Sequence, residues 1–299
     1  MKIDEQWFDA AFLDRLRMLF FKLRKRRHFE RKGSQSSPAS GFTREFKDHR
    51  HYVAGDDYRS IDWRLFARLN RTFVRVFEEV QEFHVHVLLD RSQSMIEPYP
   101  RKGALAVQLA LALTYLGLVN GHRVSLLSWA EELRRELPPL KGQGHIYDVL
   151  TLLSRLEFGG CSDLDGVMKQ FRPGRDRRGI VFVISDLLSR RPEEIPSALK
   201  RAVAWPAETH LIQILDPAEM APDLQGEIRL IDVETDEPRR VWLTRRETER
   251  YREAFAAWRE ELARVCSRNR LDYVHWTTDR AFDDMFLELL SRGSALAGK

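Results

Sequence analysis

The segment Val85-His86-Val87-Leu88-Leu89-Asp90-Arg91-Ser92-Gln93-Ser94-Met95 joins an apolar run to a group of short polar side chains. The apolar half predicts a buried strand, and the polar half predicts a loop that leaves the strand. Asp90, Ser92 and Ser94 offer a carboxylate and two hydroxyls, the hard oxygen ligands that Mg²⁺ or Mn²⁺ prefers. The same spacing suits a turn or a helix cap, so this segment alone leaves both interpretations open.

Two later segments supply side chains of the same kind. The glycine-rich loop 159–164 contains Ser162 and Asp163, and the apolar run 179–184 ends in Ser185 and Asp186. Loops at the carboxyl ends of neighbouring parallel strands meet at one crevice of an open sheet. We therefore expect Ser162 and Asp186 to join the first loop in one metal site.

Apolar strand patterns alternate with helical patterns through most of the chain, which predicts right-handed crossovers and a doubly wound, largely parallel α/β sheet. Residues 226–244 read as a β-hairpin inserted in this alternation. The expected strands are 85–89, 123–129, 179–185, 209–215 and 271–276, with an edge strand at 132–137, and the expected helices are 101–119, 146–156, 164–171, 193–204, 245–268 and 282–290.

The composition indicates a globular chain with a mixed surface. Its 299 residues include 49 basic and 45 acidic side chains, for a net charge of +4, which gives no indication of nucleic-acid binding. Cys161 and Cys266 lack the spacing of a disulfide framework or zinc knuckle, so we expect a cytoplasmic protein in a reducing compartment. Cys161 is expected to be a small buried core residue.

The start of the chain carries no signal-peptide pattern. The apolar run 104–119 is interrupted by polar residues and falls short of a membrane span, so a buried core helix is expected there. Residues 1–31 predict an amphipathic helix with a basic end, and residues 32–41 a Ser-, Gly- and Pro-rich linker. The helix either packs on its own domain, which we favour, or rests weakly on an anionic membrane; nucleic-acid contact through its basic end is a further alternative. Its apolar positions are Phe8, Phe12, Leu16, Leu19, Phe20 and Leu23.

Residues 42–82 form a small β-rich segment with one distinctive block. Gly55 followed by Asp56 and Asp57 favours a tight turn, and the aspartates can cap a short helix at 60–68. Arg59 is placed to bridge the carboxylates.

This block and its neighbours Glu45-Phe46, Arg50 and Tyr52 resemble the bacterial domain-of-unknown-function 58 family. Members of that family place a Gly-Asp-Asp-x-Arg-x-Ile-Asp-Trp block ahead of a von Willebrand factor A domain. The matching residues here are Gly55, Asp56, Asp57, Arg59, Asp62 and Trp63, and the resemblance extends from about residue 40 onward.

The resemblance implies a von Willebrand factor A, Rossmann-like domain at residues 83–292 with a metal-ion-dependent adhesion site. Its ligands would be Asp90, Ser92, Ser94, Ser162 and Asp186, with Ser162 where the family usually has Thr. The serine keeps the hydroxyl and loses only a methyl group. The resemblance also implies a partner, a MoxR-type AAA+ ATPase, with this chain as an adaptor in protein maturation or remodelling.

The expected function is metal-dependent protein binding without catalysis. A metal held by hydroxyls and two carboxylates can accept an acidic side chain from a partner surface, and Arg91, Gln93 and Asp163 lie where they could touch that partner. Ser92 stands where a phosphomonoesterase needs an acid, and no nucleotide-binding, serine-hydrolase or zinc-protease motif occurs. A metal-dependent phosphoester hydrolase is the catalytic alternative, and we expect neither a small-molecule substrate nor nucleic acid. His84 and His86 share one strand face, which is expected to be a packing feature because no third zinc ligand is near.

Overall fold

A computed structural model describes residues 12, 14–19, 43–80, 83–174, 179–189, 191–233 and 237–292 of the chain. Two compact units are distinguished by their internal contacts. One consists of Met1–His28 together with Phe83–Lys299, and the other of Phe29–Glu82. The smaller unit is therefore inserted between two segments of the larger one.

The larger unit is built on a seven-stranded sheet in the order β11-β8-β7-β3-β4-β5, with β6 also paired to β4. The strands are β3 (His84–Asp90), β4 (Arg123–Trp129), β5 (Leu133–Arg135), β6 (Leu140–Lys141), β7 (Gly179–Ser185), β8 (Ala207–Leu215) and β11 (Asp272–Thr277). Pairings among β3, β4, β7, β8 and β11 are parallel, whereas β5 and β6 run antiparallel to β4. The predicted doubly wound, largely parallel α/β fold is confirmed, with an antiparallel edge.

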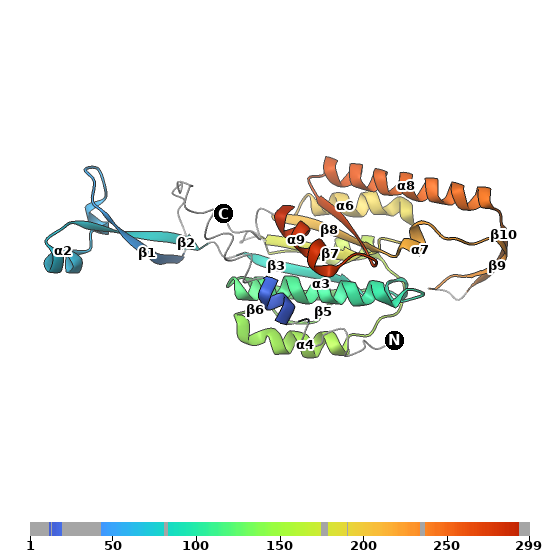
Figure 1. Ribbon diagram of the computed structural model, residues 1–299, viewed down its shortest axis with the longest axis horizontal. Coiled ribbons are helices and arrows are strands. Elements are labelled where there is room, and N and C mark those ends of the chain that lie inside the picture. The colour runs from blue at the N-terminus through green and yellow to red at the C-terminus, as the bar shows by residue number, and fades with distance from the viewer. Residues whose placement is uncertain are drawn as a thin grey trace. The chain divides into compact units, whose positions relative to one another are not determined.

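Helices cover both faces of this sheet (Figure 1). They are α3 (Pro100–Val119), α4 (Ile146–Arg155), α5 (Leu164–Gln170), α6 (Ile195–Ala202), α7 (Pro217–Met220), α8 (Arg245–Arg268) and α9 (Phe282–Arg292). Alternate side chains of β3 enter two different cores, because successive residues of a strand point to opposite faces. Val85, Val87 and Leu89 pack with α3, α4 and α9, whereas Leu88 packs with α5, α6 and α8.

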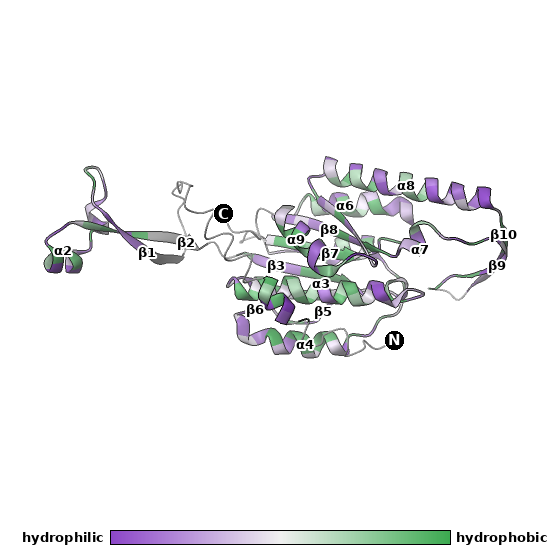
Figure 2. Ribbon diagram, viewed as in Figure 1, coloured by the Kyte–Doolittle hydropathy of each residue, from purple (hydrophilic) through white to green (hydrophobic). Residues whose placement is uncertain are grey.

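Helix α3 is mostly apolar after its first turn, and most of its residues are buried in the core (Figure 2). Within the described ranges it is the one helix long and apolar enough to cross a membrane, but 78% of its apolar window is buried inside the protein. A Cβ atom at Gly117 would lie 2.6 Å from Cγ2 of Val124 on β4. The glycine therefore lets α3 approach the sheet closely.

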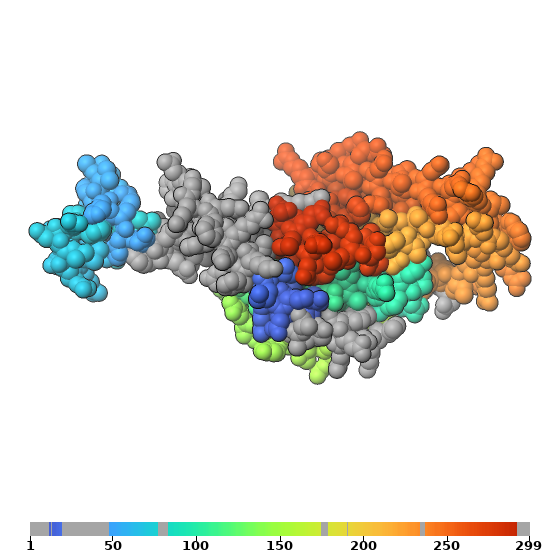
Figure 3. Space-filling model, in the orientation of Figure 1, coloured from blue at the N-terminus to red at the C-terminus, as the bar shows by residue number. Residues whose placement is uncertain are grey.

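The N-terminal segment adds an apolar face to the same core. Residue 12 and residues 14–19 are helical, and Phe12, Leu16 and Leu19 are buried. The ring of Phe12 meets that of Phe282 edge to face, with centroids 5.2 Å apart, and the segment lies against α9 and α3 in Figure 3. These three side chains pack on their own domain, as favoured above. The other predicted apolar positions (Phe8, Phe20, Leu23), the basic end and the linker 32–41 lie outside the described residues.

The smaller unit is an antiparallel pair, β1 (Thr43–His51) and β2 (Phe73–Val80), joined by η3 (Tyr58–Ser60) and α2 (Trp63–Leu69). Asp57 caps η3 through the Arg59 N–H, and Asp62 caps α2 through the N–H groups of Arg64 and Leu65. The buried side chains of Ile61 and Val74 lie at an isolated bridge that joins this connection to β2.

The expected bridging role of Arg59 is wrong. Arg50, near the end of β1, forms the bidentate pair instead. Its Nη1 and Nη2 atoms each donate to one oxygen of the Asp56 carboxylate at 2.6 Å. Hydrogen bonds from Arg50, and then from the Val53 N–H, lower the pKa of Asp56 to about 2. Arg59 lies over the Tyr58 ring, 5.9 Å from its centroid. Trp63 of the same block is 61% exposed, so it is not a core residue of the unit.

The residues predicted as an inserted hairpin form β9 (Gly226–Ile231) and β10 (Pro238–Leu243), an antiparallel pair separate from the main sheet. The hairpin connects α7 to α8 (Figure 1). Its apolar side chains are only partly covered, and Trp242 is 68% exposed.

Candidate metal site

The centre of the candidate site is the buried carboxylate of Asp90, the last residue of β3. Its Oδ1 accepts a hydrogen bond from the Ser92 N–H at 2.9 Å. Its Oδ2 accepts from the hydroxyls of Ser162 at 2.9 Å and Ser185 at 2.6 Å. One backbone N–H and two hydroxyls, from three separate segments of the chain, therefore meet at one carboxylate.

Backbone contacts hold the first two loops together. The Gln93 N–H donates to the Gly160 carbonyl at 2.9 Å, and the Gly159 N–H donates to the Arg91 carbonyl at 2.8 Å. Gly160 has φ +82°, a left-handed conformation that favours glycine. Ser92 immediately precedes the short helix η4 (Gln93–Met95), and its hydroxyl lies 3.1 Å from that of Ser94.

Asp186, which follows β7, is fully buried and paired with a lysine. The ammonium of Lys102 donates to Oδ2 of Asp186 at 2.9 Å and to Oε1 of Glu219 at 2.5 Å. The Leu188 N–H donates to Oδ1 of Asp186 at 3.0 Å. Burial opposes the charge on Lys102, but the two carboxylates outweigh it, so the pKa of Lys102 is raised.

Asp90 and Asp186 differ in how their charges are balanced. Burial, and then the negative charge of Asp186, raise the pKa of Asp90 to about 6, against the opposing hydrogen bonds from Ser185 and Ser92. Among the described residues no cationic side chain forms an ion pair with Asp90, whereas Lys102 neutralises Asp186. A buried carboxylate surrounded by hydroxyl oxygens and lacking a countercharge fits a small divalent cation.

The donors at this site are mainly hydroxyls. Across the described part of the chain, no three His, Cys, Asp or Glu side chains gather in a way that could hold a metal. The rings of His84 and His86 stack with centroids 3.9 Å apart, and Nε2 of His84 lies 2.8 Å from the Ser125 hydroxyl. Both histidines thus take part in packing on the strand face.

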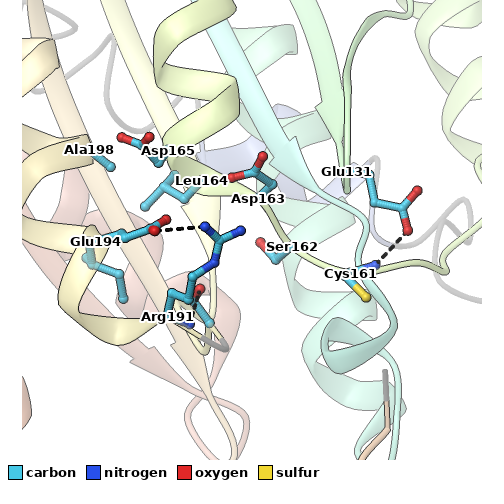
Figure 4. Close-up of a pocket in the computed structure, with 11 residues that line it drawn as sticks. Glu131, Cys161, Ser162, Asp163, Leu164, Asp165, Arg191, Glu194 and Ala198 are labelled. Carbon is cyan, nitrogen blue, oxygen red and sulfur yellow. Dashed lines mark hydrogen bonds and ion pairs between the residues drawn. The ribbon is translucent and has the colours of Figure 1, made fainter. Parts of the chain in front are cut away.

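A pocket of about 250 Å³ opens beside Ser162 (Figure 4). Its lining includes Cys161, which is half-buried and not the buried core residue expected, because its loop forms one wall of the pocket. Asp163 also lines the pocket, and its Oδ1 accepts the Gly166 N–H at 3.0 Å as the cap of α5. On the far side Arg191 pairs with Glu194 at 2.8 Å. The half-buried Arg91 and Gln93 are not part of the lining.

The structure thus joins Asp90, Ser92, Ser94 and Ser162 by direct or shared hydrogen bonds, and it places Asp186 beside them on the neighbouring strand end. Sequence reasoning named Ser185 at the strand end without assigning it to the site, and it missed Lys102 and Glu219. Lys102 was recognisable as a charged residue at the start of an otherwise apolar helix. Glu219 was recognisable as the fourth residue of an Asp-Pro-Ala-Glu capping box. Neither pattern indicates that the two side chains meet.

The sequence of the chain matches the model of a known protein family. The family model described as "Protein of unknown function DUF58" matches residues 48–263. The chain belongs to this family. The match begins within β1 and includes every residue of the candidate site described above.

Two curated relatives of this DUF58 protein carry the description "Uncharacterized protein". Proteins of Mycobacterium bovis and Mycobacterium tuberculosis are 29% identical to it over 259 residues, which cover 84% of this chain and 80% of theirs. Among solved structures, the hypothetical protein BatB of Bacteroides thetaiotaomicron is 13% identical with a TM-score of 0.44, covering 73% of this chain and all of that one. A mussel byssus matrix protein with a zinc-occupied MIDAS motif is 18% identical with a TM-score of 0.35, over 45% of this chain and 38% of that one.

Proposed function

We propose that this DUF58 protein is a non-enzymatic, metal-dependent protein-binding module. The observation that supports this best is the Asp90 carboxylate, which is buried, accepts hydrogen bonds from the Ser162 and Ser185 hydroxyls and the Ser92 N–H, and has no ion-pair partner among the described residues. Mg²⁺ or Mn²⁺ suits such hard oxygen donors better than zinc does.

Asp90, Ser92, Ser94 and Ser162 would hold the ion, with Asp186 adding negative charge from the adjoining strand end. When bound, the ion supplies a Lewis-acidic position that can take a carboxylate oxygen from an acidic partner surface. The chain's own residues fix the geometry, because Ser185 restrains Asp90 and the backbone bonds between the first two loops keep the hydroxyls in place. The pocket beside Ser162 leaves room for a partner side chain.

The proposed partner is a MoxR-type AAA+ ATPase, which this chain would assist as a cytoplasmic adaptor in maturing or remodelling other proteins. This partner is implied by the family resemblance and by no contact in the molecule. ATP hydrolysis would belong to the partner.

We also propose that the chain has no catalytic turnover of its own. A hydrolase needs a free nucleophile or base beside the metal. Asp90 accepts three hydrogen bonds, and Lys102 is committed to two carboxylates, so neither side chain is free for that role. Phosphatase activity against a generic phosphoester that is lost in Asp90→Ala would reverse this assignment.

The test is capture of the purified MoxR-type ATPase from the same organism on the immobilised chain. Capture is expected in Mg²⁺, loss in EDTA and recovery when Mg²⁺ returns. Asp90→Ala should behave like the EDTA sample, and Asp148→Ala, a substitution at an exposed carboxylate, should behave like the wild type. Capture that persists both in EDTA and in Asp90→Ala would refute metal-dependent binding.

A further inference from the structure

Lys102 is fully buried at the edge of the candidate site and contacts two acidic side chains. Its ammonium lies 2.9 Å from Asp186, which follows β7, and 2.5 Å from Glu219 of α7. The lysine itself comes from the first turn of α3. Its charge is thus fixed between two acidic residues that come from separate parts of the sheet edge.

The charges of Lys102 and of the three carboxylates at the site together balance the charge of one divalent cation. Asp90, Asp186 and Glu219 contribute three carboxylates, and Lys102 contributes one ammonium, which leaves two net negative charges. One divalent cation cancels them. Without the lysine the loaded site would keep one net negative charge, in an interior where charges interact more strongly than they do in water.

We propose that Lys102 determines the ligand specificity of the site, because its ammonium keeps the metal-loaded site neutral and so open to a carboxylate. This inference rests on the proposed function. Lys102 lowers the affinity of the site for the cation, since it adds positive charge beside it, and it favours the subsequent approach of an anion for the same reason. The class of ligand selected is a carboxylate on a protein surface.

The two effects have opposite signs, which separates this role from simple bracing of the loops. If Lys102 were only a brace, its loss would disorder the site and weaken cation and carboxylate binding together. If it sets the charge balance, its removal tightens cation binding and weakens carboxylate binding.

Lys102→Met tests this prediction, because methionine is an unbranched side chain that suits a buried position. Calorimetry with Mn²⁺ alone is expected to give at least tenfold tighter binding than in the wild type. Acetate, the smallest carboxylate probe, is then titrated into the Mn²⁺-loaded protein and followed by the relaxation of water protons near the ion. Acetate affinity is expected to fall severalfold. Lys200→Met, at an exposed lysine, is the matched control and should change neither value.

Glu219→Gln tests the same balance in the other direction and serves if Lys102→Met fails to fold. It removes one negative charge and retains the lysine, so Mn²⁺ should bind more weakly and acetate more tightly. Folded variants that show unchanged affinities, or both affinities lowered together, would overturn the inference. A wild-type protein that binds no Mn²⁺ would remove the proposed function itself, and this inference with it.

Discussion

Ser185 donates a 2.6 Å hydrogen bond from its hydroxyl to Oδ2 of Asp90, although the two residues lie 95 positions apart in the sequence. The contact is possible because β3 and β7 are parallel neighbours. The same hydroxyl accepts the Leu187 N–H at 2.9 Å, so one serine orients the central carboxylate and its own loop. Asp90 is consequently held in place by the protein before any ion arrives.

Asp90→Ala is expected to abolish binding of Mg²⁺ and Mn²⁺, because it removes the one carboxylate of the site that lacks a cationic partner among the described residues. Titration calorimetry on the wild type and the variant measures this directly. Asp148→Ala removes a carboxylate that is 61% exposed and should leave the affinity unchanged. Undiminished binding in Asp90→Ala would place the ion elsewhere.

His86→Leu should reduce the acid sensitivity of the fold. Burial, and then the neighbouring charges of His84 and Arg135, lower the pKa of His86 to about 3 in the folded chain, against about 6.5 when unfolded. The unfolded chain therefore binds more protons between these values, and the stability present above pH 6.5 is lost as the pH falls toward 3. That loss is at most about 5 kcal/mol for this group, since a shift of one pKa unit corresponds to about 1.4 kcal/mol.

Urea unfolding at pH 7.5, 5.5 and 4.0 checks this expectation. The free energy of unfolding should fall less steeply with acidification in His86→Leu than in the wild type. A substitution at the exposed His275, to Gln, controls for the loss of a histidine. If the free energy of unfolding falls equally with pH in His86→Leu and in the wild type, His86 is not the source of the acid sensitivity.

Gly117→Ala should destabilise the larger unit. The new Cβ would lie 2.6 Å from the Cγ2 of Val124, a buried, β-branched residue of β4 that has little freedom to move. Overpacking costs about 1–3 kcal/mol, and the better helix propensity of alanine offsets up to about 1 kcal/mol. Gly144→Ala meets no atom within 4 Å and should be nearly neutral. Thermal unfolding of both variants tests this expectation. Equal unfolding midpoints for Gly117→Ala and Gly144→Ala would contradict the close packing of α3 against β4.

Neighbouring residues of the family block should respond differently to substitution. Asp62→Ala removes a cap that accepts two backbone N–H groups and contacts His49, which costs about 1–2 kcal/mol. Trp63→Ala truncates a side chain that is 61% exposed and should change stability by less than about 0.5 kcal/mol. Amide hydrogen exchange across α2 and β2 reports on this unit alone. Faster exchange in Trp63→Ala than in Asp62→Ala would indicate that the indole supports the unit.

Sequence periodicity predicted the long elements well, because a long strand or helix repeats its buried, apolar positions often enough for the period to be recognised. The strands 123–129 and 179–185 and the helix 245–268 have the predicted bounds. The two-residue β6 and the four-residue α7 were not predicted, because elements this short contain too few residues to show a periodic pattern.

The part of the site that depends on the positions of the loops could be predicted from the sequence. Parallel strands bring the ends of β3 and β7 together, which placed Asp90 and Asp186 at one edge. The spacing of residues in the sequence does not show which partner a long side chain will contact. Arg50 therefore took the role expected of Arg59, and the meeting of Lys102 with Glu219 across 117 positions was not foreseeable.

The contact between Phe12 and Phe282 also limits how the larger unit can be studied in isolation. A fragment cut at residue 83 would keep all seven strands of the sheet and every candidate ligand. It would lose Phe12, Leu16 and Leu19, three side chains that are now buried in the core. The ring of Phe282 and its neighbours would face water as an apolar patch, and such patches favour association. The shortened protein is therefore expected to aggregate for a reason unrelated to its metal site.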